Sequence, residues 1–164
     1  MNNAKSDFER WFVQPLRQLE NIPNGDGAFI ALASSCFLYE RYIRAKAAHT
    51  LGLKPDERFI PERPKQIAVD FQVDEDTARA FWDVMRNGLL HFAMPKHLKG
   101  TKKSPRWHFH HDYTQSIQLN QWADGKWYLE IQPWKVVDRV LVICAQNINL
   151  ITETQGFPWA IIEN

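Results

Sequence analysis

Arg86, Asn87 and His91 are the residues whose types and spacing indicate chemistry in this chain of 164 residues. The guanidinium group of an arginine is a planar fork of N–H donors that matches the oxygens of a carboxylate or a phosphate. A histidine titrates near neutral pH, so it can both accept and donate a proton. Positions 87 and 91 are neighbours on a helix surface, where the amide of Asn87 can fix the orientation of the His91 ring. Together these residue types predict a site for proton transfer beside an anion.

A strongly helical run from Asp74 to Phe92 carries these residues. At about 100° per residue, its apolar side chains share one face: Ala78, Phe81, Trp82, Met85, Leu89 and Phe92. Asp83, Asn87 and His91 fall on the opposite face, and Arg86 lies on the flank between the two faces. The pattern predicts that the apolar face packs into a core and that the helix ends near Ala93, because Pro95 follows.

Two residues of this run break its pattern. Leu90 points away from the apolar face, which indicates that a partner covers it. Gly88 destabilises a helix by about 1 kcal/mol relative to alanine. A glycine at such a position allows the close approach of a backbone, a helix or a phosphate.

Positions 86–91, Arg-Asn-Gly-Leu-Leu-His, stand in the second half of a helical region and resemble the Arg-x4–6-His motif of the HEPN superfamily. Members of that superfamily are small helical domains. Many are metal-independent ribonucleases of toxin–antitoxin, abortive-infection and related defence systems. The polar residue after the arginine is commonly asparagine, which Asn87 matches, and two protomers usually bring their motifs together across a dimer cleft. The resemblance covers residues 6–93 in helical character, whereas the C-terminal third departs from it.

The resemblance implies an endoribonuclease that needs no metal or other cofactor. His91 would act as general base or acid at the ribose 2′-hydroxyl, Arg86 would stabilise the charge of the phosphorane, and Asn87 would position His91 or the phosphate. It also implies a homodimer, with RNA as substrate and an antitoxin or another protein as partner. The alternative is a non-catalytic module whose motif helix serves only for dimerisation or for binding nucleic acid or protein. A third interpretation places Arg86 and His91 in unrelated structural ion pairs.

Glu40 is an acid in the middle of an apolar helix face. The helix is predicted from Ala28 to Leu51, and its inner face consists of Phe29, Leu32, Ala33, Cys36, Ile43 and Ala47. A carboxylate there must find a partner or remain protonated. Arg86, a hydroxyl group and a water molecule are candidates, whereas Arg41 and Arg44 lie too close in sequence to be obvious ones. Glu40 is therefore interpreted as part of a structural buried pair or as a group that orients Arg86, unless the helix phase is wrong.

Residues 94–106 are predicted to form a basic loop directly after the motif helix. The segment contains five basic residues and no acid: Lys96, Lys99, Lys102, Lys103 and Arg106. Lysines near a polar helical site steer a phosphate backbone towards it. The competing interpretation of this segment is a solvated connector. Residues 52–73, before the motif helix, are also predicted to be a connector, with at most short helical turns.

Residues 107–164 are predicted to form a hairpin and one further helix. Alternation over 107–112 indicates a strand, and 116–120 and 126–132 pair across the turn signal Asp124-Gly125. His108 and His110 would share one strand face, so with Asp112 they are zinc-ligand candidates, although surface histidines are the preferred interpretation. Stacking of Trp107 or Phe109 on RNA is a further alternative. The helix follows from Pro133 to about Asn147, and residues 159–162 are a candidate edge strand.

The whole composition is that of an ordinary globular protein. Hydrophobic residues make up 45% and charged residues 24% of the chain, and the formal net charge of +1 selects no class of partner. A single α+β domain over residues 1–164 is expected, mainly a helical bundle with a small antiparallel hairpin or sheet in its C-terminal third. The N-terminal residues lack the apolar core of a signal peptide and no apolar run approaches about 18 residues, so neither a signal peptide nor a membrane span is expected. Cys36 and Cys144 are interpreted as reduced core thiols, which predicts a cytoplasmic protein.

Overall fold

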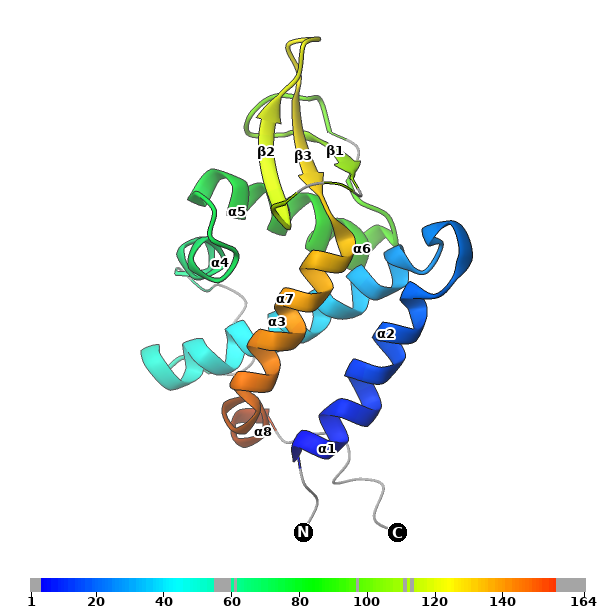
Figure 1. Ribbon diagram of the computed structural model, residues 1–164. Helices are drawn as coiled ribbons and strands as arrows, with labels where there is room; N and C mark the ends of the chain where they lie inside the picture. The colour runs from blue at the N-terminus through cyan, green and yellow to red at the C-terminus, as the bar shows by residue number, and fades with distance from the viewer. Residues whose placement is uncertain are drawn as a thin grey trace.

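A long central helix, α3 (Ala28–Leu51), runs through the molecule, and the other helices pack around it (Figure 1). The computed structural model describes residues 4–54, 60, 62–96, 98–110, 112 and 114–155. The sheet projects from one end of the helical body, as Figure 1 shows. The structure is therefore α+β and mainly helical, and the predicted bounds of the central helix are confirmed.

The N-terminal helical segment changes helix type before Pro15. α1 (Ala4–Phe8) passes into a π-helical turn, η1 (Glu9–Val13), and then into α2 (Gln14–Glu20). Pro15 has no N–H to donate, and it stands in the first turn of α2, directly after the π-helical turn. Phe8 and Leu16 anchor this segment in the core, and a short 3-10 turn, η2 (Pro23–Gly25), leads on to α3.

The motif run has the predicted extent but contains a change of helix type. It consists of α5 (Glu75–Phe81), the π-helical turn η3 (Trp82–Arg86) and α6 (Asn87–Phe92). Asp74 caps it, because its Oδ1 accepts a hydrogen bond of 2.7 Å from the Thr77 N–H. The predicted apolar face is buried at Ala78, Phe81, Trp82, Met85 and Leu89, while the side chains of Leu90 and Phe92 lie outside what the structure describes.

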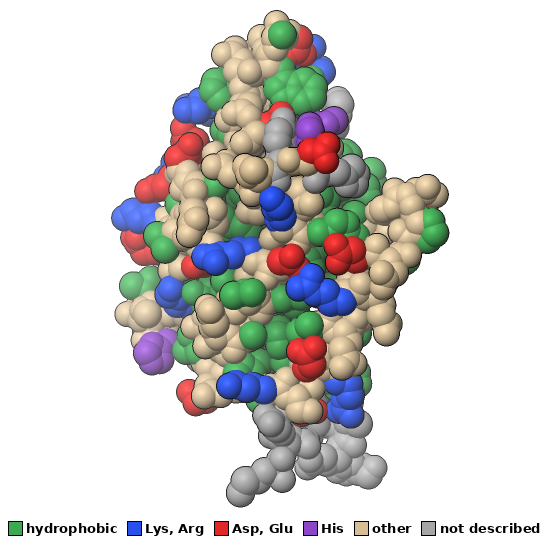
Figure 2. Space-filling view, in the orientation of Figure 1, with side chains coloured by type: hydrophobic (Ala, Val, Ile, Leu, Met, Phe, Trp, Pro, Cys, Tyr) green, Lys and Arg blue, Asp and Glu red, His purple; other side chains and the backbone are tan. Residues whose placement is uncertain are grey.

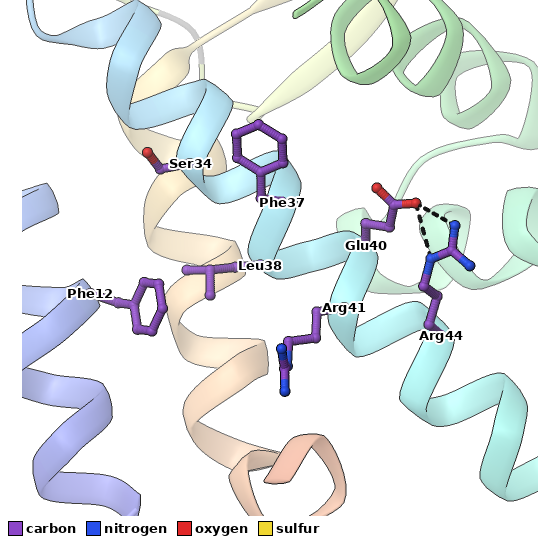
Figure 3. Close-up of a pocket in the computed structure, with 7 residues that line it drawn as sticks. All are labelled: Phe12, Ser34, Phe37, Leu38, Glu40, Arg41 and Arg44. Atoms are coloured by element: carbon purple, nitrogen blue, oxygen red, sulfur yellow. Dashed lines mark hydrogen bonds and ion pairs between the residues drawn. The ribbon is translucent and has the colours of Figure 1, made fainter. Parts of the chain in front are cut away.

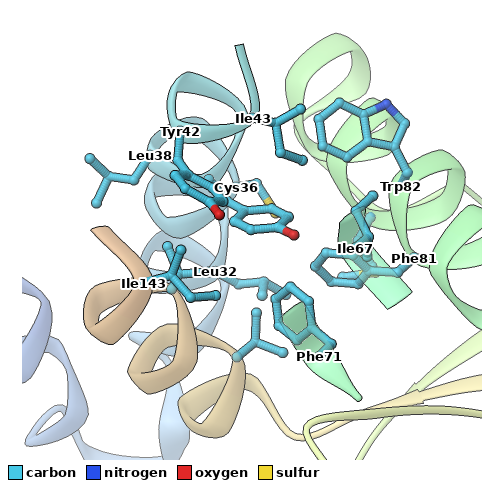
Figure 4. Packing of buried hydrophobic residues seen from close by; sticks show 14 of the residues in the cluster. Leu32, Cys36, Leu38, Tyr42, Ile43, Ile67, Phe71, Phe81, Trp82 and Ile143 are labelled. Atoms are coloured by element: carbon cyan, nitrogen blue, oxygen red, sulfur yellow. The ribbon is translucent and has the colours of Figure 1, made fainter. Parts of the chain in front are cut away.

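The predicted connector 52–73 is wrong in its second half. Residues 63–71 form a helix of two and a half turns, α4 (Arg63–Phe71). Pro64 stands in its first turn, so this proline begins a helix rather than interrupting one. The Tyr39 hydroxyl donates a 2.7 Å hydrogen bond to Asp70 and ties α4 to α3, and Figure 4 shows Ile67 and Phe71 in the common apolar core.

Gly88 is where the chain after the motif helix returns against it. A Cβ atom at this position would lie 2.6 Å from the backbone nitrogen of Lys96 and 2.7 Å from the carbonyl oxygen of Met94. The Lys96 N–H donates a 3.0 Å hydrogen bond to the carbonyl of Val84. The predicted close approach is thus confirmed, and the approaching group is the backbone of residues 94–96.

We expect Gly88→Ala to lower the free energy of unfolding by about 1–3 kcal/mol, as overpacking does, although alanine is the better helix former. Ala93 provides a control that is not expected to lower stability, because this residue ends α6 in a left-handed conformation, with φ of 56°. Ala93→Gly relieves that left-handed conformation, so it should be neutral or stabilising. Urea denaturation measures both, and a Gly88→Ala variant as stable as the wild type would contradict the close approach.

Among the described residues, three strands form the sheet, in the order β1-β3-β2. They are β1 (Arg106–Phe109), β2 (Ile117–Gln121) and β3 (Trp127–Ile131). The predicted antiparallel hairpin of β2 and β3 is confirmed, but β1 pairs with β3 in parallel, so the sheet is mixed. Trp107 and Phe109 of β1 pack against Phe29, with ring centroids 6.0 and 4.8 Å from it. These two rings therefore belong to the packing between sheet and helix.

Residues 133–155, the last that the structure describes, form two helices. α7 (Pro133–Gln146) is the predicted one, and its inner face is buried at Val136, Val137, Val140, Leu141 and Cys144. α8 (Ile148–Gln155) was not expected, and residues 159–162 lie outside the described residues.

Cys36 and Cys144 are buried free thiols, and burial raises the pKa of each to about 12. None of the described helices combines the length and the apolar character that crossing a membrane requires.

Candidate functional site

Glu40 lies between two arginines, and each of its carboxylate oxygens is bound by one of them. Arg86 donates to Oε2 from Nε, at 3.0 Å, and from Nη2. Arg44 donates to Oε1 from Nε and Nη2, at 3.1 and 2.8 Å. The side chains of Glu40 and Arg86 are only 14% and 15% exposed. The predicted burial of Glu40 and its pairing with Arg86 are confirmed, whereas the role of Arg44, one helical turn away, was missed.

The charges of the arginines decide the ionisation of Glu40. Burial alone would raise the pKa of this carboxyl group, but the hydrogen bonds and charges of Arg86 and Arg44 outweigh burial and lower the pKa below its ordinary value of 4.5. The carboxylate is therefore ionised at neutral pH. Because one negative charge serves two guanidinium groups, the cluster retains a positive charge.

Arg86 is also held by its own helix. Its Nη1 donates a 2.8 Å hydrogen bond to Oδ1 of Asn87. Its guanidinium carbon lies 5.0 Å from the centroid of the Trp82 ring, and that of Arg63 lies 4.5 Å from the same centroid. Burial lowers the pKa of Arg63. Contacts from Glu40 of α3, Trp82 of η3 and Asn87 of α6 thus hold the Arg86 guanidinium group in place.

The Asn87 amide joins Arg86 to a second ion pair. Its Nδ2 donates a 3.3 Å hydrogen bond to Oδ1 of Asp83, which also accepts one of 2.5 Å from Lys96 Nζ. The amide oxygen binds Arg86, so both ends of this side chain contribute to positioning the arginine. From the sequence, Asn87 was expected to position His91 or a phosphate. His91 itself is exposed in the last turn of α6, five residues after Arg86.

The basic segment returns to the motif helix instead of extending from it. Lys96 pairs with Asp83, and Lys102 pairs with Asp76 at 2.7 Å. Arg106 contacts the Tyr128 hydroxyl at 3.4 Å, while Lys99 and Lys103 are exposed. In Figure 2, acidic and basic side chains are interspersed over the visible face. The predicted concentration of positive charge is therefore partly neutralised. Lys99, Lys102 and Lys103 are all exposed, but of these three only Lys102 takes part in an ion pair found among the described residues.

The histidine-bearing strand belongs to a polar network on the outer face of the sheet. The rings of His108 and His110 are 5.5 Å apart, and His108 lies 5.1 Å from Trp122. Trp122 Nε1 donates a 2.6 Å hydrogen bond to Glu130, a buried carboxylate that also accepts from Gln118 and Asn120. Asp112 is exposed, His111 lies outside the described residues, and the described residues contain no group of three side chains arranged to hold a metal ion.

A cleft beside Glu40 was not predicted. It lies between the N-terminal helical segment and α3, and its volume is about 490 Å³ (Figure 3). Its walls combine apolar and charged side chains, which are Phe12, Ser34, Phe37, Leu38, Glu40, Arg41 and Arg44. Phe37 is 53% exposed, which is unusual for a large aromatic residue in a core helix. Helical periodicity places Phe37 and Arg41 off the inner face of α3 but gives no sign of a hollow there.

Comparisons with models of protein families, with curated proteins and with solved structures found no match. The chemistry of the site therefore has to be inferred from its own residues.

Proposed function

We propose that this chain is a metal-independent endoribonuclease of the HEPN type, with Arg86 and His91 as catalytic residues. The observation that carries the proposal is the arrangement around Arg86. Glu40, Asn87 and Trp82 hold its guanidinium group in place, five residues before an exposed histidine on the same helical run. A fixed cation and a solvent-accessible proton carrier on one helical run are a combination suited to cleaving a phosphodiester.

In the proposed reaction His91 removes the proton from a ribose 2′-hydroxyl group. The 2′-oxygen attacks the adjacent phosphorus, and the bond from phosphorus to the 5′-oxygen breaks. The departing oxygen receives a proton from a protonated histidine, and one product carries a 2′,3′-cyclic phosphate. Because the nucleophile belongs to the substrate, the reaction requires no metal-bound water. A homodimer through the face of Asp83, Asn87, Leu90 and His91 would supply two histidines to one cleft.

Arg86 retains hydrogen-bonding capacity for this role. A guanidinium group has five N–H donors. Glu40 and Asn87 accept from three of them, so two remain beyond the hydrogen bonds found among the described residues. A preorganised donor of this kind stabilises the negative charge that develops on the phosphorane. Glu40 and Asn87 are positioning residues in this account, and the metal-free cleavage assay described in the Discussion tests it.

A specific observation favours a second candidate, a non-catalytic binding module. Ile30 and Phe37 are 59% and 53% exposed and stand seven residues apart on α3, so they share a face of that helix. Exposed apolar residues that share a face are typical of a protein-binding surface. In this alternative the Glu40–Arg86 pair serves stability only, and purified protein leaves RNA intact.

The exposed lysines should make RNA binding dependent on salt. We expect the Lys99→Glu and Lys103→Glu double variant to reduce the slope of log Kd against log salt by about two, as losing two phosphate contacts does. The double variant Lys65→Glu and Lys135→Glu is the control, since these two lysines lie outside the basic segment, on α4 and α7. Fluorescence anisotropy measures the slopes. An unchanged slope in the Lys99 and Lys103 variant would identify the segment as a solvated connector.

A further inference from the structure

The cleft on α3 shares Glu40 with the Arg86 site. The same carboxylate that lines the cleft accepts hydrogen bonds from Arg44 at one oxygen and from Arg86 at the other. Figure 3 shows Phe12 facing the α3 residues from the N-terminal segment, with Glu40 and Arg44 paired at the far side. A molecule in this cleft would therefore contact a residue that positions the proposed catalytic arginine.

The charges around the cleft favour an anion. Arg41 and Arg44 line it, and Glu40 is the single acid among its described lining residues. Glu40 is already shared between Arg44 and Arg86, so the surroundings carry an excess of positive charge. Burial lowers the pKa of Arg41, which means that its environment opposes a positive charge. An anion next to that guanidinium group would favour its charged form and so offset the free-energy cost of the desolvation.

The walls also offer a flat apolar surface. Phe37 is half exposed, and Phe12 and Leu38 line the same cleft. The volume of about 490 Å³ lies within the usual range of small-molecule sites, about 300–1,000 Å³. An exposed aromatic ring next to guanidinium groups is the pair of features with which proteins hold single-stranded nucleic acid, because bases stack on rings and phosphates bind cations.

We propose that this cleft binds one nucleotide of a single-stranded RNA, with the base against Phe37 and a phosphate on Arg41 and Arg44. The proposal rests on the proposed function, since it makes the cleft a substrate subsite next to Arg86. The carboxylates of an acidic peptide would use the cations but offer no flat ring, whereas every nucleotide carries a flat base together with a phosphate, so the exposed aromatic side chain favours the nucleotide.

Binding of a fluorescent single-stranded RNA with 2′-O-methyl riboses tests this inference, because that RNA lacks the nucleophile and cannot be cleaved. Phe37→Ala should weaken binding about 5- to 150-fold, the range that corresponds to loss of one stacked base. Phe37→Trp should restore it, and Arg41→Gln should lower the salt slope by about one. Val69→Ala and Arg17→Gln are the matched controls, since these residues are exposed on other helices.

The outcomes separate the subsite from the proposed function. Loss of affinity in Phe37→Ala, with rescue by tryptophan, supports the subsite even if unmodified RNA is never cleaved. Cleavage of unmodified RNA together with unchanged affinity of Phe37→Ala overturns the subsite and leaves the ribonuclease in place. A wild type that binds polyglutamate but no RNA, or a Phe37→Ala variant that loses only dimerisation, also overturns it and assigns the cleft to a protein partner.

Discussion

His91→Ala is expected to reduce the rate of RNA cleavage by about 10²–10⁴-fold, because proton transfer by a positioned side chain contributes that much. His91 is exposed, so the variant should fold as the wild type does. His49→Ala is the matched control, since His49 is also exposed and lies in the last turn of α3. Equal loss in both variants, or no loss in His91→Ala, would remove His91 from the reaction.

Arg86 variants belong to the same experiment but need a stability measurement beside the kinetics. Arg86→Ala should slow cleavage by about 10²–10³-fold, the usual effect of removing one charge-stabilising donor. Arg86→Lys should rescue poorly, because an ammonium group cannot reproduce the planar set of bonds to Glu40 and Asn87. The double variant Arg86→Ala and His91→Ala should slow cleavage by a factor much smaller than the product of the two single factors. The sequence placed Arg86 on the flank between the apolar and polar faces, which predicts that its variants fold, but the structure buries its side chain with Glu40, so we expect its loss also to affect folding.

Glu40→Ala should lower the free energy of unfolding by more than about 2 kcal/mol, because it leaves the buried Arg86 charge without its partner. Glu75→Ala is the control. It removes a surface pair with Arg79 whose side chains are 40% and 58% exposed, and such pairs contribute about 0–1 kcal/mol. Urea denaturation at neutral pH measures both variants. A Glu40→Ala variant within experimental error of the Glu75→Ala control would show that the pair adds no stability.

The effect of Glu40 should depend on pH in one direction. Folding lowers its pKa below the ordinary 4.5, so its stabilising contribution is present above that value and is lost as the pH falls through the folded-state pKa. The stability difference between wild type and Glu40→Gln should therefore shrink on acidification. A difference that stays constant between neutral and acidic pH would mean that the carboxylate charge is not what stabilises the fold.

Much of the helical framework could be predicted because helical periodicity is a local property. The limits of α3, the apolar face of the motif run and the buried face of α7 all follow from residues within one segment. The burial of Glu40 also followed from helical periodicity, which places this residue on the inner face of α3. The resemblance to HEPN ribonucleases remains a prediction, since it rests on six residues and on helical character.

The contacts that complete the site could not be predicted, because they join distant segments. The return of Lys96 and Lys102 to Asp83 and Asp76 depends on how the chain turns after Gly88. The parallel pairing of β1 with β3 is likewise non-local. α4 was missed because three prolines between residues 55 and 64 indicate a connector, although Pro64 suits a first helical turn. The hydrogen bond from Arg44 to Glu40 was within reach of the sequence, as an i, i+4 pair on one helix.

The central claim is tested most directly by cleavage of RNA in excess EDTA by protein whose dimeric state has been verified by light scattering. The wild type should produce 2′,3′-cyclic phosphate ends, and His91→Ala should not. An otherwise identical RNA with a single 2′-deoxyribose at the cut position should remain intact there, because the internal nucleophile is missing. Absence of cleavage across varied RNAs, dependence on a divalent metal, or cutting at the 2′-deoxyribose position would contradict the account.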